Sequence, residues 1–223
     1  MMRQVAEEMD SYRVDFERIE RGSADRRPQW INQIHTAAFG RFVELGFPTT
    51  RLEDWKYTNV APIVKTPFTR AEQACGTLPV EPLGPFTLEE VACAQLVFVN
   101  GHYSSDLSSL EKLPEGVTVS SLAAVLASNP GSVEAHLAQH ASYHDQAFVA
   151  LNTAFMGDGA FVSIPKDTIV DAPIHLLFIS SARLGPPVPA GFKPGAGTKG
   201  FPTLISFLDS GFHRNDTFYK AIT

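Results

Sequence analysis

The sequence predicts an α+β protein with helices near its N-terminus and strands further along the chain. Three observations lead to this prediction. Apolar residues between Val5 and Leu45 recur at steps of three and four, the spacing of amphipathic helices. Two β-rich runs bounded by turn residues occupy positions 159–165 and 174–180. Beyond residue 182 the chain is dense in proline and glycine, which predicts an irregular tail over 183–223.

Two antiparallel helices are expected first. Five apolar residues share one face of the first helix: Val5, Met9, Tyr12, Phe16 and Ile19. Gly22 ends this helix, and the second begins near Pro28, whose missing N–H does no harm in a first turn. The buried stripe of the second helix is expected to contain four residues: Ile31, Ile34, Ala38 and Leu45. Gly46 then stops it.

A polar elbow with the sequence FPTTRLEDWKYTN follows at positions 47–59. Trp55 and Tyr57 have apolar rings with polar ends, and a cation from Arg51 or Lys56 can stack on such rings. Two interpretations remain open. The rings form a ligand-stacking site, or they fix the elbow onto the two-helix unit, and the second interpretation is favoured.

The middle of the chain alternates between loops and short elements. Five prolines within 60–88 predict a loop-rich connection. A buried strand over 94–100 ends in an Asn100–Gly101 turn. A strand at 117–119 precedes a helix that Ser120 or Ser121 caps, and helical spacing returns at 133–144 and 147–155. The later strands fit a sandwich, a meander or a β-solenoid, and strand spacing does not separate these.

The composition disfavours several classes of protein. A formal net charge of −6 argues against nucleic acid as a partner, because phosphate binding needs clustered positive charge. No apolar run approaches the roughly 18–20 residues that span a bilayer, so no membrane partner is expected. Acidic residues near the N-terminus do not fit a signal peptide. Cys75 and Cys93 form no CxxC motif and are expected to be packing thiols in the reducing cytoplasm.

Three histidines raise the possibility of a metal site. His136, His140 and His144 recur at every fourth position of the helix expected at 133–144, and HxxxH is a known metal-ligand spacing. Leu137 stands where a zinc peptidase carries its glutamate base, which argues against that enzyme class. Packing and surface histidines are the favoured interpretation. A histidine-ligated metalloprotein that uses this HxxxHxxxH face is the alternative function.

The sequence predicts no catalytic residue and no enzyme. It contains no GxSxG nucleophile elbow. Residues 195–200 match GxGxxG, but a proline-rich run at 186–189 precedes them where a dinucleotide site requires a strand.

Two sequence blocks resemble one protein family. FPTTRLEDWKYTNV, at 47–60, resembles the N-terminal signature of SufD-type members of the SufB/SufD family of Fe–S cluster assembly proteins. LNTAFMGDGAFVSIPKDTIVDAPIHLLFISS, at 151–181, resembles the segment where that family enters its β-helix core. A third stretch, at 98–126, lies between them in the expected order. The signature residues are Phe47, Pro48, Arg51, Glu53, Asp54, Trp55, Lys56, Tyr57, Asn152, Thr153, Phe155, Pro173 and His175.

The resemblance implies an N-terminal helical domain followed by the start of a right-handed parallel β-helix. The chain then divides into a helical region at 1–60, a mixed connecting region at 61–146, the start of the β-helix core at 147–182 and the irregular tail at 183–223. The implied function is that of a non-catalytic scaffold subunit in a SufBCD-type complex, with SufB-like and SufC-like partners. The chain alone is expected to bind no cofactor, because partner subunits of the complex handle Fe–S clusters and ATP.

The resemblance ends near residue 182. Family members are considerably longer, and their SufC contact and the histidine proposed to help hold a nascent cluster lie in the C-terminal half. The expectation is therefore a truncated or frame-shifted product that has lost the SufC contact. Neither His175 nor His213 is assigned the role of that histidine.

Overall fold

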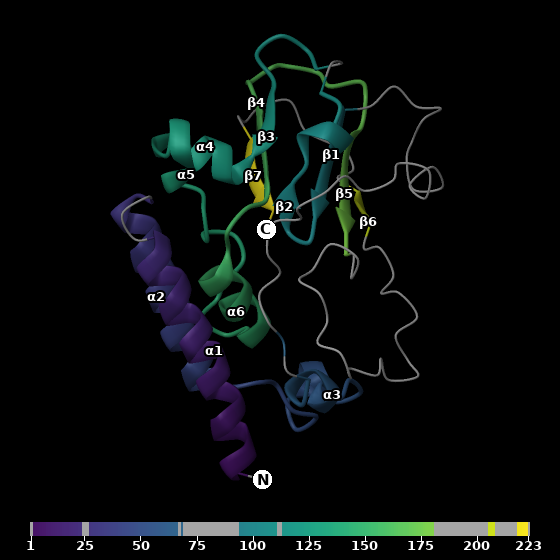
Figure 1. Cartoon of the computed structure of the whole chain (residues 1–223). Coiled ribbons are helices and arrows are strands. Elements are labelled where there is room, and N and C mark those ends of the chain that lie inside the picture. Colours follow the sequence, from purple (N-terminus) through teal and green to yellow (C-terminus); the bar gives the residue numbers. More distant parts are fainter. Residues whose placement is uncertain are drawn as a thin grey trace. The chain divides into compact units, whose positions relative to one another are not determined.

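The computed structural model describes residues 2–23, 27–66, 68, 94–110, 113–180, 205–207 and 218–222 (Figure 1). The chain divides into two compact units. Unit 1 consists of residues 1–70 and 125–156 with residue 223, and unit 2 consists of residues 71–124 and 157–222. The two units interleave along the sequence, whereas the predicted boundaries cut the chain into consecutive segments.

Unit 1 is helical. Its main elements are α1 (Met2–Ser23), α2 (Gln29–Leu45), the 3₁₀ turn η2 (Glu53–Trp55), α3 (Ala61–Val64), α5 (Gly131–Glu134) and α6 (Ala147–Phe155). The predicted helices in the first 45 residues and at 147–155 are thereby confirmed. Gly46 ends α2 as expected, with a φ of 63° and its N–H donating to the Phe42 carbonyl at 2.8 Å.

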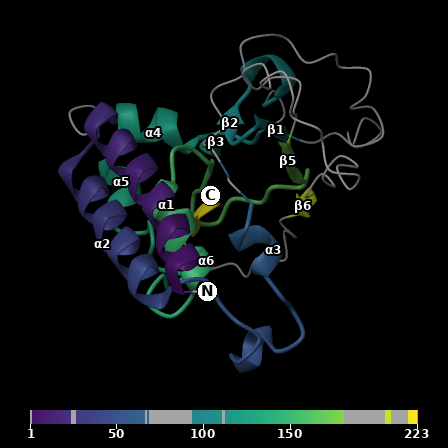
Figure 2. The same ribbon diagram turned by 60° about the horizontal axis from the view of Figure 1, so that its bottom comes forward.

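The core of unit 1 lies where α1, α2 and α6 meet, and both ribbon views show these helices side by side (Figures 1 and 2). The Phe16 and Phe39 rings stack with their centroids 4.2 Å apart. The buried residues of α2 are Ile31, His35, Ala38, Phe39 and Phe42. The predicted stripe had Ile34 and Leu45 in place of His35 and the two phenylalanines. Ile34 and Leu45 are only half-buried, so the stripe follows a slightly different face.

The prediction of a helix over 133–144 is wrong. α5 ends at Glu134, turns follow it, and Ala138 has a φ of 59°, which no α-helix accommodates. Within this segment Val133 and Leu137 are the buried residues, and most of the side chains after Leu137 are exposed. Helices this short need tertiary packing to persist. The buried turn at Val133 and Leu137 anchors the start of the segment, and of the segment's residues that follow only Tyr143 packs against the core of unit 1.

Unit 2 contains two sheets. Its strands are β1 (Ala94–Val99), β2 (His102–Tyr103), β3 (Thr118–Ser121), β4 (Ala160–Ile164), β5 (Ile174–Ile179), β6 (Ile205–Phe207) and β7 (Phe218–Ile222). The strand orders are β2-β1-β5-β6 and β3-β4-β7. The 3₁₀ turn η4 (Ser105–Leu107) follows β2, and α4 (Leu122–Ser128) follows β3 across the residue boundary between the units. The predicted strands at 94–100, 117–119, 159–165 and 174–180 are confirmed.

The described strands do not show the right-handed parallel β-helix that the family resemblance implies. Among the described strands, β1 and β5 pair in parallel, from Ala94 opposite Ile174 to Val99 opposite Ile179. The other four pairs are antiparallel. Asn100 and Gly101 make the predicted tight turn with φ of 50° and 83°, the positive values that a type I′ hairpin requires.

The central strands β1 and β5 are buried on both faces, which explains their nearly continuous apolar sequences. On one face Leu96 and Leu176 join the larger core cluster of unit 2. On the other face Val97, Val99 and Leu177 form a second cluster.

The prediction of an irregular tail is wrong for two segments. β6 pairs with β5, and β7 pairs with β4 along five residues of each strand. Exposed strand edges offer unpaired N–H and C=O groups, so even a sequence with weak alternation can add to them. Cys75, Cys93, His213 and the GxGxxG match lie outside the described residues.

Candidate functional site

The elbow after α2 is held by Phe47 and Trp55. Phe47 contacts the rings of Phe42 and Tyr12, with centroids 5.2 and 5.7 Å away. Trp55 packs on Phe148 of α6 at 5.3 Å. Aromatic rings do hold the elbow, but the prediction that Trp55 and Tyr57 fix it onto the first two helices is wrong. Phe47 makes the contact with those helices, and Trp55 contacts α6. Tyr57 does not take part, because it is 91% exposed.

The charged residues of the elbow face solvent. Arg51, Glu53, Asp54 and Lys56 are all exposed. The Lys56 Nζ lies 3.6 Å from a Glu53 carboxylate oxygen and 5.6 Å from the centroid of the Tyr57 ring. Lys56 is thus the cation of the predicted stacking pair. Exposed contacts of these two kinds each stabilise a protein by at most about 1 kcal/mol.

A cavity of about 470 Å³ lies within unit 1 beside the elbow. Five of its lining residues are aromatic: Tyr12, Phe47, Phe68, Phe148 and Phe155. The other four are Asp15, Ile63, Leu151 and Asn152. Phe47 comes from the first sequence block, and Asn152 and Phe155 come from the second. The fold therefore brings members of both blocks to one cavity, although about a hundred residues separate them.

The remaining signature residues lie elsewhere. Pro48 and Thr153 are buried in unit 1, and neither lines the cavity. Pro173 and His175 belong to unit 2. His175 is buried, and its Nδ1 lies 3.1 Å from the Oε1 of Gln95, its registered neighbour on β1. Because an amide oxygen only accepts, this Nδ1 carries the proton, and burial lowers the pKa of His175.

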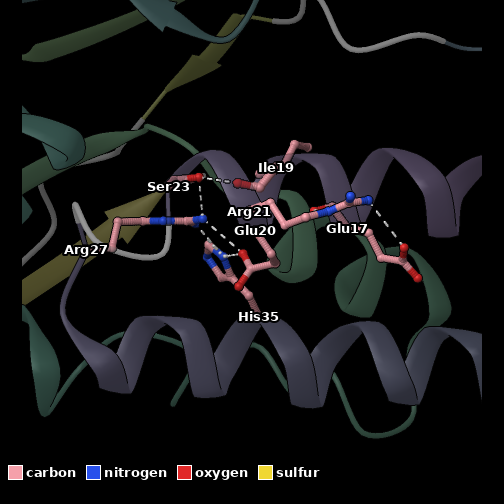
Figure 3. Close-up of polar contacts among 7 residues, drawn as sticks. All are labelled: Glu17, Ile19, Glu20, Arg21, Ser23, Arg27 and His35. Carbon is pink, nitrogen blue, oxygen red and sulfur yellow. Dashed lines mark hydrogen bonds and ion pairs between the residues drawn. The ribbon is translucent and has the colours of Figure 1, made fainter.

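A polar cluster between α1 and α2 is a functional candidate that the sequence prediction missed (Figure 3). The Arg27 guanidinium lies 2.9 Å from Glu20 Oε1, 2.7 Å from Ser23 Oγ and 2.7 Å from His35 Nδ1. Ser23 donates in turn to the Ile19 carbonyl. One sequence feature could have indicated this cluster. His35 lies four residues after Ile31 and three before Ala38, which places a polar side chain inside the apolar stripe of the second helix.

His35 is neutral in this cluster. Its side chain is 1% exposed, and the Arg27 guanidinium can only donate, so His35 Nδ1 accepts and the proton sits on Nε2. Burial, assisted by the positive charge of Arg27, lowers the pKa of His35 to about 4, while Glu20 opposes the shift. The cluster surrounds the half-buried Arg27 guanidinium with one carboxylate, one hydroxyl and one imidazole, while Arg27 Nε and His35 Nε2 have no hydrogen-bond partner within the described part of the chain. This arrangement joins the two helices.

Acidification is therefore expected to destabilise unit 1 through His35. The imidazole of the unfolded chain takes up a proton near pH 6.5, whereas that of the folded chain resists protonation down to about pH 4. Stability present above pH 6.5 is thus lost as the pH falls toward 4, by about 3 kcal/mol in total. Urea denaturation at several pH values, followed by tryptophan fluorescence, measures this loss, since Trp30 and Trp55 both lie in unit 1.

His35→Gln is the control for this prediction. It keeps an acceptor for Arg27 and removes the titration, so its stability is expected to depend less steeply on pH between 4 and 6.5. Parallel pH profiles for the two proteins would show that His35 does not titrate as described.

Asp158, between two glycines, is a second residue that the sequence prediction missed. Its Oδ1 accepts from Ser121 Oγ at 2.7 Å, from the Ala123 N–H at 3.0 Å and from the Gly159 N–H at 2.8 Å. Its Oδ2 accepts from the Tyr103 N–H at 3.0 Å. Ser121 Oγ also accepts from the Ala124 N–H, which confirms Ser121 as a cap of the helix after β3. Asp158 has a structural role: it ties β3, α4 and the start of β4 together.

The structure removes the basis of the metal-site alternative. His136, His140 and His144 do not share a helical face, because α5 ends at Glu134. The His144 carbonyl instead accepts a hydrogen bond from Arg41 of α2. No group of three or more His, Cys, Asp or Glu side chains within the described part of the chain is arranged to hold a metal ion. None of the described helices is long and apolar enough to cross a membrane.

Comparison with known proteins adds two findings. Residues 6–176 match the family described as the SufBD protein N-terminal region. An iron–sulfur cluster assembly SufBD family protein of Synechocystis sp. is 33% identical to this chain over 136 residues. That match covers 61% of this chain and 29% of the relative. The matched part of this chain thus corresponds to less than a third of the relative's length.

Proposed function

The chain belongs to the SufB/SufD family, and from this premise we propose that it acts in Fe–S cluster assembly as a non-catalytic scaffold subunit of a SufBCD-type complex. The observation that carries the proposal is the family match over residues 6–176, which spans most of the chain. The name of the Synechocystis relative, which places that protein in iron–sulfur cluster assembly, supports it. The elbow sequence at 47–60 favours a SufD-type subunit over a SufB-type one.

The described structure is compatible with a scaffold. Its conspicuous polar groups, Asp158 and the Arg27–Glu20–His35 cluster, hold elements together and have their acceptors occupied by protein donors. Groups that bind or activate a substrate need to be presented to it instead. In this proposal the chain works in the cytoplasm by binding the SufB-like subunit of a complex that also contains a SufC-like subunit. Clusters and ATP are handled by those partners, and the chain alone holds no cofactor.

Co-purification tests the proposed partners. The full 223-residue chain is co-expressed with an affinity-tagged SufB-like subunit, with a tagged SufC-like subunit, or with the tag alone. We expect the SufB-like subunit to retain the chain through affinity and size-exclusion steps, and the tag alone to retain none. Retention by neither subunit would overturn the scaffold proposal.

Metal analysis of the chain by itself tests the proposed absence of a cofactor. Protein purified without chelator is expected to contain far less than one equivalent of iron or zinc. His140→Ala serves as the matched variant. A stoichiometric metal content in the unsubstituted chain that is lost in His140→Ala would instead support the alternative function, a histidine-ligated metalloprotein.

A further inference from the structure

The cavity of unit 1 is open and strongly apolar. Five aromatic rings contribute to its walls, and Leu151 adds an aliphatic surface. Two lining residues, Ile63 and Phe68, remain 41% and 49% exposed. Apolar surface left in water is unfavourable, so a hollow of this composition favours an apolar occupant. Its volume of about 470 Å³ falls within the range of roughly 300–1,000 Å³ typical of binding pockets.

One lining residue of the cavity, Asp15, carries a negative charge. Asp15 of α1 is a lining residue with its side chain 23% exposed. The ion pair that the structure gives it is with Arg18, whose Nη2 lies 2.9 Å from Asp15 Oδ1 and whose side chain is 65% exposed. Exposed pairs of this kind contribute at most about 1 kcal/mol. A cation on an incoming partner can therefore share the carboxylate or displace Arg18 at little cost.

We propose that this cavity docks a segment of a partner polypeptide through an apolar anchor side chain followed directly by a lysine or arginine. The anchor fills the aromatic hollow, and the cation pairs with Asp15. Charge complementarity supports a basic partner, because the chain carries a formal net charge of −6 and opposite charges accelerate encounter. The exposed side chains of Ile63 and Phe68 favour a polypeptide over a small molecule, since a chain running past the hollow covers them as well.

Short peptides provide the probe. The full chain, labelled with ¹⁵N, is titrated with acetyl-Gly-Phe-Lys-Gly-amide while its amide chemical shifts are followed. We expect saturable shifts at Asp15, Leu151 and Phe155. The peptide with glutamine in place of lysine is expected to bind about fivefold more weakly, the factor that corresponds to about 1 kcal/mol of ion pairing. The peptide with glycine in place of phenylalanine is expected to cause no saturable shift.

Matched variants assign the charge effect to one residue. Asp15→Asn is expected to weaken binding of the lysine peptide about fivefold and to leave binding of the glutamine peptide unchanged. Asp10→Asn removes an exposed carboxylate from the same helix outside the cavity and is expected to change neither. Ile63→Ser alters a lining residue that is 41% exposed and lies outside the core, and it is expected to weaken binding of both peptides.

Three results would overturn the docking proposal. The first is the absence of saturable shifts at the cavity residues. The second is equal affinity for the lysine and glutamine peptides, or an unchanged affinity in Asp15→Asn. The third is binding of 2-phenylethylammonium as tight as that of the lysine peptide, which would assign the cavity to small organic cations. None of these results bears on the SufB-like partner, because that interaction is measured separately by co-purification.

Discussion

Replacing Phe42 with alanine is expected to destabilise unit 1 by about 3–5 kcal/mol, the usual cost of emptying a buried aromatic site. The Phe42 side chain is fully buried, and its ring makes edge-on contacts with Tyr12 and Phe47. The substitution therefore removes buried apolar area, two aromatic contacts and the wall that holds the elbow. Collapse around the vacancy is limited because α1, α2 and α6 all border this core.

Urea denaturation followed by tryptophan fluorescence measures the Phe42→Ala effect, since both tryptophans report on unit 1. Val14→Ala is the matched control. Val14 lies on α1 but is 63% exposed, so its truncation is expected to change stability by no more than about 0.5 kcal/mol. Similar midpoints for the two variants would mean that Phe42 does not organise this core.

Replacing Asp158 with alanine is expected to destabilise unit 2 by about 3 kcal/mol. The carboxylate accepts from four donors, three of them backbone N–H groups of Tyr103, Ala123 and Gly159. A buried donor left without an acceptor costs roughly 1–3 kcal/mol. Asp158 is only half-buried, so water compensates part of the loss, and the total stays below the sum for four donors.

Hydrogen exchange at the Tyr103, Ala123 and Gly159 amides, together with thermal unfolding, measures the Asp158→Ala effect. Asp158→Asn retains one acceptor oxygen and is expected to cost less than half as much. Asp106→Ala removes an exposed carboxylate from the same unit and is expected to be nearly neutral. Unchanged exchange at the three amides in Asp158→Ala would refute the structural role of this carboxylate.

The elements that the sequence predicted well are those with strong local signals. The stop of α2 at Gly46, the Asn100–Gly101 turn and the capping of α4 by Ser121 each depend on the chemistry of one or two residues. The strands β1, β4 and β5 follow from apolar runs bounded by turn residues. The helix expected over 133–144 failed because spacing alone does not supply the buried partners that a short helix needs.

The residues of the candidate sites also divide into those that the sequence singled out and those that it missed. Phe47, Asn152 and Phe155 were singled out as signature residues, but nothing local indicates that they border one cavity. His35 and Asp158 were missed, because a histidine within an apolar stripe and an aspartate between glycines have many possible roles. Their roles depend on Arg27 and on four donors that lie mostly far away in the sequence.

The sequence by itself determined the α+β class, the main helices and strands, and the family, because these depend on local spacing, turn chemistry and short identifying blocks. Tertiary structure alone decided that β1 pairs in parallel with β5, that β6 adds to one sheet and that β7 adds to the other. It likewise decided that residues from two distant sequence blocks line one cavity. It also decided that His35 is neutral and that Tyr57 is exposed. Each of these depends on which surfaces meet, and pairing, burial and desolvation between distant segments leave no pattern within any one segment.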